Sequence, residues 1–151
     1  MAKRVKQKQI DKLLAEASRI EALLKAELGD MPITWGVSYD ATALGRSFKW
    51  YKGMKDGGYN PAYPQVYIKL STTLAKLNIK KQREIIIHKL AQSVVELKDE
   101  HGKEFREAFS RLLSIYRFKT GELIKSADYH HFSSDINKQA SRLYRQLVNK
   151  G

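Results

Sequence analysis

The sequence contains no cysteine, only three prolines and no long apolar run. The lack of cysteine excludes disulfide bonds, cysteine-ligated zinc ribbons and a thiol nucleophile. The basic N-terminal stretch leads into an amphipathic pattern and not into about 18 consecutive apolar residues, so we expect neither a signal peptide nor a membrane span. We therefore expect a cytoplasmic protein, with a nucleoid-associated position, or the host cytoplasm for a viral protein, as variants of that location.

Acidic residues are also few. The 151 residues include 28 Lys and Arg against 16 Asp and Glu, which gives a net charge of +12. Such a charge attracts nucleic acid by releasing condensed counterions, and it equally attracts an acidic protein or an anionic membrane. A solvated basic surface without a dedicated ligand is the plain alternative. The length and the 42% apolar content predict a single domain over residues 1–151.

Apolar residues at helical spacing predict four helices. They are expected at about residues 5–28, 79–97, 102–117 and 134–149. The first and last are basic on their outer faces. The second is apolar around much of its circumference, which is typical of a helix buried in the middle of a domain.

Between the first two helices the apolar period changes to two, which predicts three short strands at about residues 33–39, 44–52 and 65–70. Glycines and prolines between the second and third strands indicate an irregular connection. Three strands in succession favour an antiparallel meander. The expected fold class is α+β, a small three-stranded antiparallel sheet packed with about four helices.

The buried second helix carries His88-Lys89-Leu90-Ala91-Gln92, and His101-Gly102-Lys103-Glu104-Phe105 follows nine residues later. Together with the strand residues 44–46, 48–50 and 68–71, these segments resemble the SprT-like, or Spartan-type, zinc metallopeptidase domain over residues 13–116. The resemblance implies a zincin-like core with an HExxH helix and a third histidine in an HGxxF sequence. It also implies work on DNA or on DNA-bound proteins.

Carried over residue by residue, the resemblance gives His88 and His101 as the surviving ligand positions. Gln92 stands at the lost ligand position and Lys89 at the position of the general base. An amide is a poorer zinc ligand than imidazole, and an ammonium cannot accept a proton from water near neutral pH. We therefore expect no bound metal, no cofactor and no peptidase activity. A core histidine bonded to Gln92 or His101 is the preferred interpretation of His88.

Two repairs of this centre stay open. A ligand can come from His130 or His131, or a base from a nearby carboxylate, namely Glu84, Glu96 or Glu104.

A basic and aromatic surface is the candidate nucleic-acid interface. If the second and third strands are neighbours, Lys49, Tyr51, Tyr67 and Lys69 form one patch in which cations meet phosphates and rings stack on bases. Tyrosines that merely cover neighbouring strands are the alternative. The full candidate set is Lys3, Arg4, Lys6, Lys8, Arg46, Lys49, Tyr51, Lys52, Tyr67, Lys69, Arg142 and Arg145.

The sequence thus predicts a catalytically inactive SprT-like domain that binds nucleic acid, with DNA preferred. One alternative is a protein-binding inhibitor or adaptor of a host or viral machine, recognising an acidic surface. The other is an atypical zinc metallopeptidase that acts on DNA-bound proteins.

Overall fold

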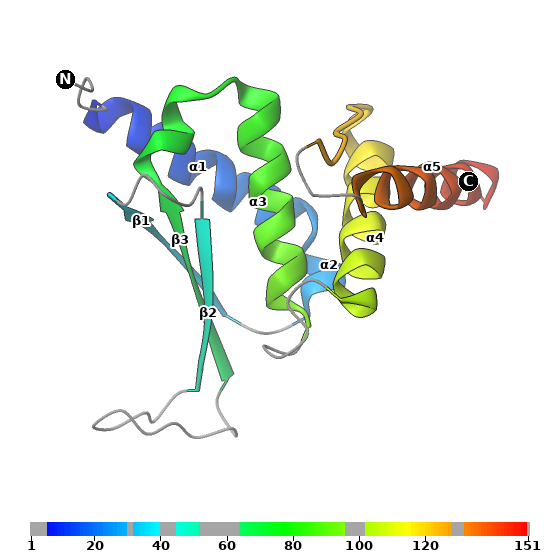
Figure 1. The fold of residues 1–151 in the computed structure, drawn as a ribbon, viewed down its shortest axis with the longest axis horizontal. Coiled ribbons are helices and arrows are strands. Elements are labelled where there is room, and N and C mark those ends of the chain that lie inside the picture. The colour runs from blue at the N-terminus through cyan, green and yellow to red at the C-terminus, as the bar shows by residue number, and fades with distance from the viewer. Residues whose placement is uncertain are drawn as a thin grey trace.

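The computed structural model describes residues 6–29, 32–39, 45–51, 64–95, 102–127 and 132–150, with the backbone alone for 45–51, 64 and 65. Helices dominate these residues (Figure 1). Their order is α1 (Gln7–Leu23), α2 (Lys25–Leu28), β1 (Ile33–Ser38), β2 (Gly45–Tyr51), β3 (Pro64–Ser71), the 3₁₀ helix η1 (Thr72–Lys76), α3 (Ile79–Ser93), α4 (Lys103–Thr120) and α5 (Ser133–Lys150).

The four expected helices are confirmed, with a break at Leu24 that divides the first into α1 and α2. Local signals explain two of the ends. Asn78 caps α3, its Oδ1 accepting a hydrogen bond from the Lys81 backbone N–H at 2.8 Å. Gly121 ends α4 in the left-handed conformation, with φ of 78°, where a residue with a Cβ would be strained.

The three strands are confirmed, but the expected antiparallel meander is wrong. The strand order is β1-β3-β2, and β1 runs parallel to β3 while β2 runs antiparallel to it. A period of two identifies a strand and its faces, but it does not specify the neighbouring strand. Here β3, whose Val66, Ile68 and Leu70 side chains are buried, takes the central position. The fold is therefore mostly helical with a small mixed sheet.

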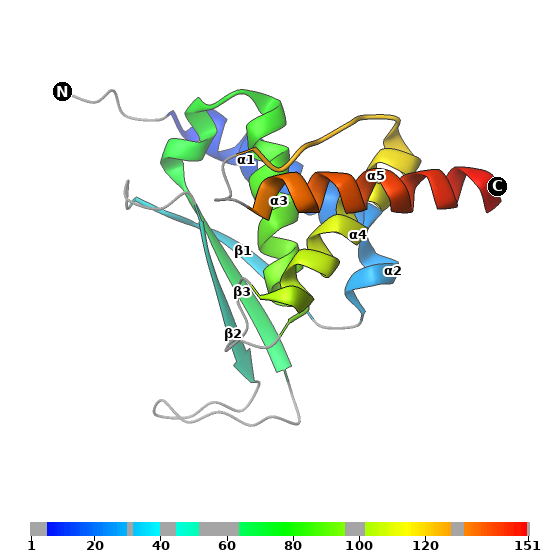
Figure 2. The same ribbon diagram turned by 45° about the vertical axis from the view of Figure 1, so that its right-hand side comes forward.

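One hydrophobic cluster lies between the inner face of the sheet and the helices. It joins residues of α1, β3, α3 and α4 with Ile124 and Ile136. Figures 1 and 2 show α3 between the sheet on one side and α4 and α5 on the other. This position explains why α3 is apolar around so much of its circumference, since it contacts neighbours on several sides.

Helix α5 packs along α4, with contacts in the same order on both helices. Arg106 lies over the ring of Phe132 at 4.4 Å, Ser110 Oγ donates a hydrogen bond to the Ile136 carbonyl at 3.2 Å, and Arg117 lies over the ring of Tyr144 at 3.9 Å. The cation–π contacts at the two ends add to apolar packing in fixing the register of α5 on α4.

Candidate functional site

His88 lies on the face of α3 that packs against α4. Its side chain is buried, and its ring centroid is 4.9 Å from that of Phe105 and 5.3 Å from that of Phe109, both tilted. Phe105 is the last residue of the HGKEF segment. The two segments that carry the resemblance therefore meet in space, through an aromatic contact of the kind that stabilises buried rings.

Lys89 and Gln92, which the SprT-like resemblance places at the base and ligand positions, interact with each other. Lys89 Nζ donates a hydrogen bond to Gln92 Oε1 at 3.0 Å, and both side chains are half-buried. The amide oxygen that would have to coordinate a metal is thus turned to an ammonium, whose charge opposes a dication at that place.

The described residues of this centre do not fit a zinc ion. Only His88 of the four histidines belongs to them; His101, His130 and His131 lie outside, as does Glu96. Over the described ranges, no group of three or more His, Asp or Glu side chains is arranged to hold a metal. Among the described residues, one imidazole beside a lysine supplies neither the three ligands nor the base of a zinc hydrolase.

Glu84, one of the candidate bases, has another role. Its carboxylate is buried and accepts hydrogen bonds from the Ala127 backbone N–H at 3.0 Å and from Lys81 Nζ at 3.4 Å. It thereby ties the segment after α4 to the first turns of α3. Glu104 is exposed in the first turn of α4, where a carboxylate interacts favourably with the helix dipole.

The outer face of the sheet carries Tyr67 and Lys69. Lys69 is exposed, and its Nζ lies 5.8 Å from the centroid of the half-buried Tyr67 ring. The same ring covers Gly36 of β1, because a Cβ built at Gly36 would lie 2.3 Å from Tyr67 Oη. The Tyr67 side chain thus lies over β1 and fills the space next to Gly36, in the way that aromatic residues cover glycines in sheets.

The strand register shows which backbone positions of β2 lie beside this face. Arg46 is opposite Lys69 and Phe48 is opposite Tyr67, whereas Lys49 is opposite Val66 and Tyr51 is opposite Pro64. Directly opposite positions share a face of a sheet, so Arg46 is the predicted site residue whose position matches Lys69. The side chains of β2 lie outside the described structure, as does all of Lys52.

The remaining candidate cations lie at two other places. Lys6 and Lys8 are exposed at the beginning of α1, and Arg142 and Arg145 are exposed in α5. The beginning of α1 and the end of α5 lie at opposite ends of the molecule in both views (Figures 1 and 2). These two pairs therefore do not join into one patch. Lys3 and Arg4 lie outside the described residues.

A polar network that the sequence does not reveal joins α1, α3 and α4. Arg83 donates to Glu16 at 2.8 Å and to Glu122 at 2.6 Å, and Glu122 also accepts from the hydroxyl of Tyr116 at 2.9 Å. Arg19 completes it by pairing with Glu16 and donating to Tyr116 Oη at 3.2 Å. Partners 67 and 39 residues apart give no local signal in the sequence.

The network shifts the titration of two of its members. The hydrogen bond from Arg19, assisted by Arg83, holds the pKa of Glu16 below its ordinary value of 4.5. Burial raises the pKa of Tyr116 above its ordinary value of 10.0. At neutral pH Glu16 is therefore charged, the guanidinium groups of Arg19 and Arg83 are charged, and the phenol of Tyr116 is neutral. This composition is typical of a structural clamp between helices.

Comparison with protein families, with curated proteins and with solved structures finds no match to this chain. Across the described residues, no helix is both long enough and apolar enough to cross a membrane.

Proposed function

We propose that this protein binds nucleic acid, DNA in preference to RNA, and has no peptidase activity of its own. The net charge of +12 supports a polyanionic ligand. A cytoplasmic or nucleoid-associated location agrees with such a ligand.

The observation that carries the proposal is the outer face of the sheet, where Lys69 is exposed beside the ring of Tyr67. The position of Arg46 lies directly opposite Lys69 on the neighbouring strand. Cations beside an aromatic ring on a sheet suit a single strand, because the cations neutralise phosphates while a ring offers a surface to a base. Since Tyr67 already covers Gly36, we assign most of the affinity to phosphate contacts and expect little sequence preference.

The resemblance to SprT-like domains supports DNA as the nucleic acid. The contact of His88 with Phe105 agrees with the expectation that the HKLAQ and HGKEF segments belong to one centre. The hydrogen bond between Lys89 and Gln92 argues against hydrolysis there, because it occupies the two positions that a zinc peptidase needs for its base and its second ligand. On this proposal the former catalytic helix serves the architecture, and the basic surface provides the function.

Fluorescence anisotropy of a labelled 20-nucleotide single strand, at about 50 and 200 mM salt, tests the proposal. We expect binding that weakens steeply with salt. Lys69→Ala should reduce the affinity about three- to tenfold and lower the salt slope by roughly 0.7. Lys25→Ala, an exposed lysine on α2, is the matched control and should change little. Absence of binding at the lower salt, or binding that ignores salt, contradicts the proposal.

The alternative functions make different predictions. A protein-binding inhibitor or adaptor would retain its partners in a pull-down after nuclease treatment, whereas nucleic-acid-mediated partners would be lost. An atypical metallopeptidase would contain stoichiometric zinc when purified without a metal-binding tag.

A further inference from the structure

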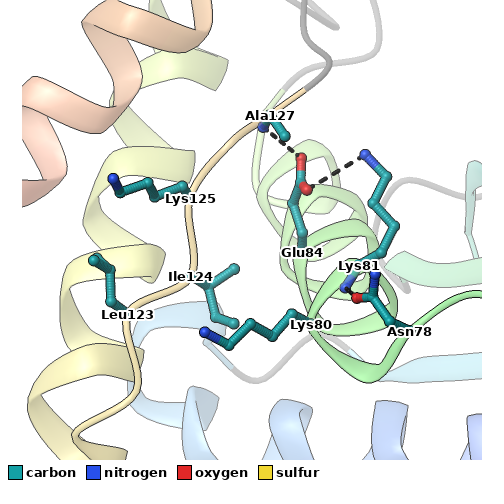
Figure 3. A pocket seen from close by; sticks show the side chains of 8 residues that line it. All are labelled: Asn78, Lys80, Lys81, Glu84, Leu123, Ile124, Lys125 and Ala127. Carbon is teal, nitrogen blue, oxygen red and sulfur yellow. Dashed lines mark hydrogen bonds and ion pairs between the residues drawn. The ribbon is translucent and has the colours of Figure 1, made fainter.

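A basic pocket of about 460 Å³ lies between the beginning of α3 and the segment that follows α4 (Figure 3). Lys80, Lys81 and Glu84 line it from α3, and Leu123, Ile124 and Lys125 line it from the other side. Its volume falls within the range of small-molecule sites, about 300–1,000 Å³. None of its lining residues belongs to a strand, so the pocket is separate from the outer face of the sheet.

The charges of the pocket are unbalanced. Three lysines face one carboxylate, and Glu84 is already committed to Lys81 and to the Ala127 backbone N–H. Figure 3 shows Lys81 turned toward Glu84, while Lys80 extends toward the segment that carries Ile124. Lys80 and Lys125 are exposed, and exposed side chains change rotamer within nanoseconds. Two ammonium groups are thus available to a ligand that carries two negative charges.

The segment opposite α3 adds an apolar surface. Ile124 is 4% exposed and anchored in the hydrophobic core, whereas Leu123 is 41% exposed. The segment itself is held in place, because Glu84 accepts from Ala127 and the Asn137 side chain bonds both the N–H and the carbonyl of Ser126, each at 2.8 Å. A fixed aliphatic side chain beside mobile cations favours a ligand that presents the face of a ring near its charge.

We propose that this pocket binds a phosphate monoester that also carries a planar ring, with the chemistry of a nucleoside 5′-monophosphate. Such a phosphate carries close to two negative charges at neutral pH and accepts several hydrogen bonds. Lys80 and Lys125 hold the phosphate, and Leu123 contacts the ring. Two sources share this chemistry, namely a free nucleotide and the 5′-phosphorylated end of a strand. The proposal for the pocket does not rest on the proposed binding of nucleic acid to the sheet, because the two sites share no residue.

The test is a titration of ¹⁵N-labelled protein with thymidine 5′-monophosphate, followed by backbone amide shifts. We expect shifts to concentrate at Lys80, Lys81, Ile124 and Ala127. Thymidine and inorganic phosphate, which each lack one half of the ligand, should bind at least about tenfold more weakly. The double variant Lys80→Gln, Lys125→Gln should weaken binding by at least about tenfold, and Lys25→Gln should not.

Three results would overturn the site: no shifts at millimolar ligand, shifts spread over exposed lysines throughout the chain, or equal weakening by Lys25→Gln. Because Lys80 and Lys125 are exposed, an unchanged amide spectrum away from the pocket verifies that the double variant is folded. Lys69→Ala should leave the titration unchanged, which separates failure of the pocket from failure of the sheet surface.

A second arm distinguishes the two sources. A 5′-phosphorylated hexathymidine and its 5′-hydroxyl counterpart are compared with the free nucleotide. Tighter pocket binding by the phosphorylated strand identifies a strand end as the ligand. If neither oligonucleotide reproduces the amide shifts that the free nucleotide causes at the pocket, the ligand is a free nucleotide.

Discussion

Lys89 donates a hydrogen bond from Nζ to Oε1 of Gln92, at 3.0 Å, along one side of the buried helix α3. The two residues at which HKLAQ differs from HExxH are therefore in contact, since the side chain of one is hydrogen-bonded to the side chain of the other. Replacing only one of them would break this hydrogen bond.

Changing both residues to those of HExxH should create a zinc site. In Lys89→Glu, Gln92→His we expect about one zinc per chain by elemental analysis, because the second imidazole then lies one helical turn from His88 and the SprT-like resemblance gives His101 as the third ligand. Adding His88→Ala should remove the metal. A double variant that folds but stays free of zinc would contradict the SprT-like resemblance.

The sequence predicts the helices and strands well, because their signals are local. The helical spacing of apolar residues marks the helices, and the alternation of Val66, Ile68 and Leu70 marks a strand. It does not predict the strand order, because alternation is the same for parallel and antiparallel neighbours. β3 takes the central position between β1 and β2, an arrangement set by pairing between strands distant in the sequence and not by a local pattern.

The candidate sites also divide into a part that local sequence signals predict and a part that depends on strand pairing. The contact of His88 with Phe105 agrees with the motif spacing. The patch of Lys49, Tyr51, Tyr67 and Lys69 rests on assumed faces, and the register instead sets Lys49 opposite Val66. A one-residue difference in register exchanges the two faces of a strand, so a surface that spans two strands is the least predictable feature of a small sheet.

Gly36 should tolerate no side chain while Tyr67 is present. A Cβ at Gly36 would lie 2.3 Å from Tyr67 Oη, so Gly36→Ala forces the ring away and should lower the free energy of unfolding by about 1–2 kcal/mol. In a Tyr67→Ala background the same substitution should cost much less. Urea denaturation of the four proteins measures the coupling. Additive effects would mean that the ring does not lie over Gly36.

The hydroxyl of Tyr116 should stabilise the helix clamp. It donates to Glu122 at 2.9 Å and accepts from Arg19 at 3.2 Å, and the side chain is fully buried. Tyr116→Phe should therefore lower the free energy of unfolding by about 1–2 kcal/mol, since it removes one hydrogen bond from Glu122 and one from Arg19. Tyr144→Phe, which keeps the ring under Arg117, is the control and should change stability by less than about 0.5 kcal/mol. If Tyr116→Phe and Tyr144→Phe lowered the free energy of unfolding equally, the hydrogen bonds of the Tyr116 hydroxyl would contribute no particular stability.

Glu16 should make stability depend on pH in the acid range. Arg19 and Arg83 hold its pKa below 4.5 in the folded protein, so the folded state binds fewer protons there than the unfolded state. The stabilisation is complete above the unfolded pKa and is lost as the pH falls through the folded pKa. At pH 7, Glu16→Gln should lower the free energy of unfolding by about 1 kcal/mol, and this difference should shrink steadily below about pH 4.5.

Glu107→Gln, an exposed carboxylate on α4, serves as the control and should show no such convergence. Denaturation curves of the three proteins between pH 3 and pH 7 provide the measurement. A constant difference between wild type and Glu16→Gln across that range would show that the pairing of Glu16 with Arg19 and Arg83 contributes no charge-dependent stability.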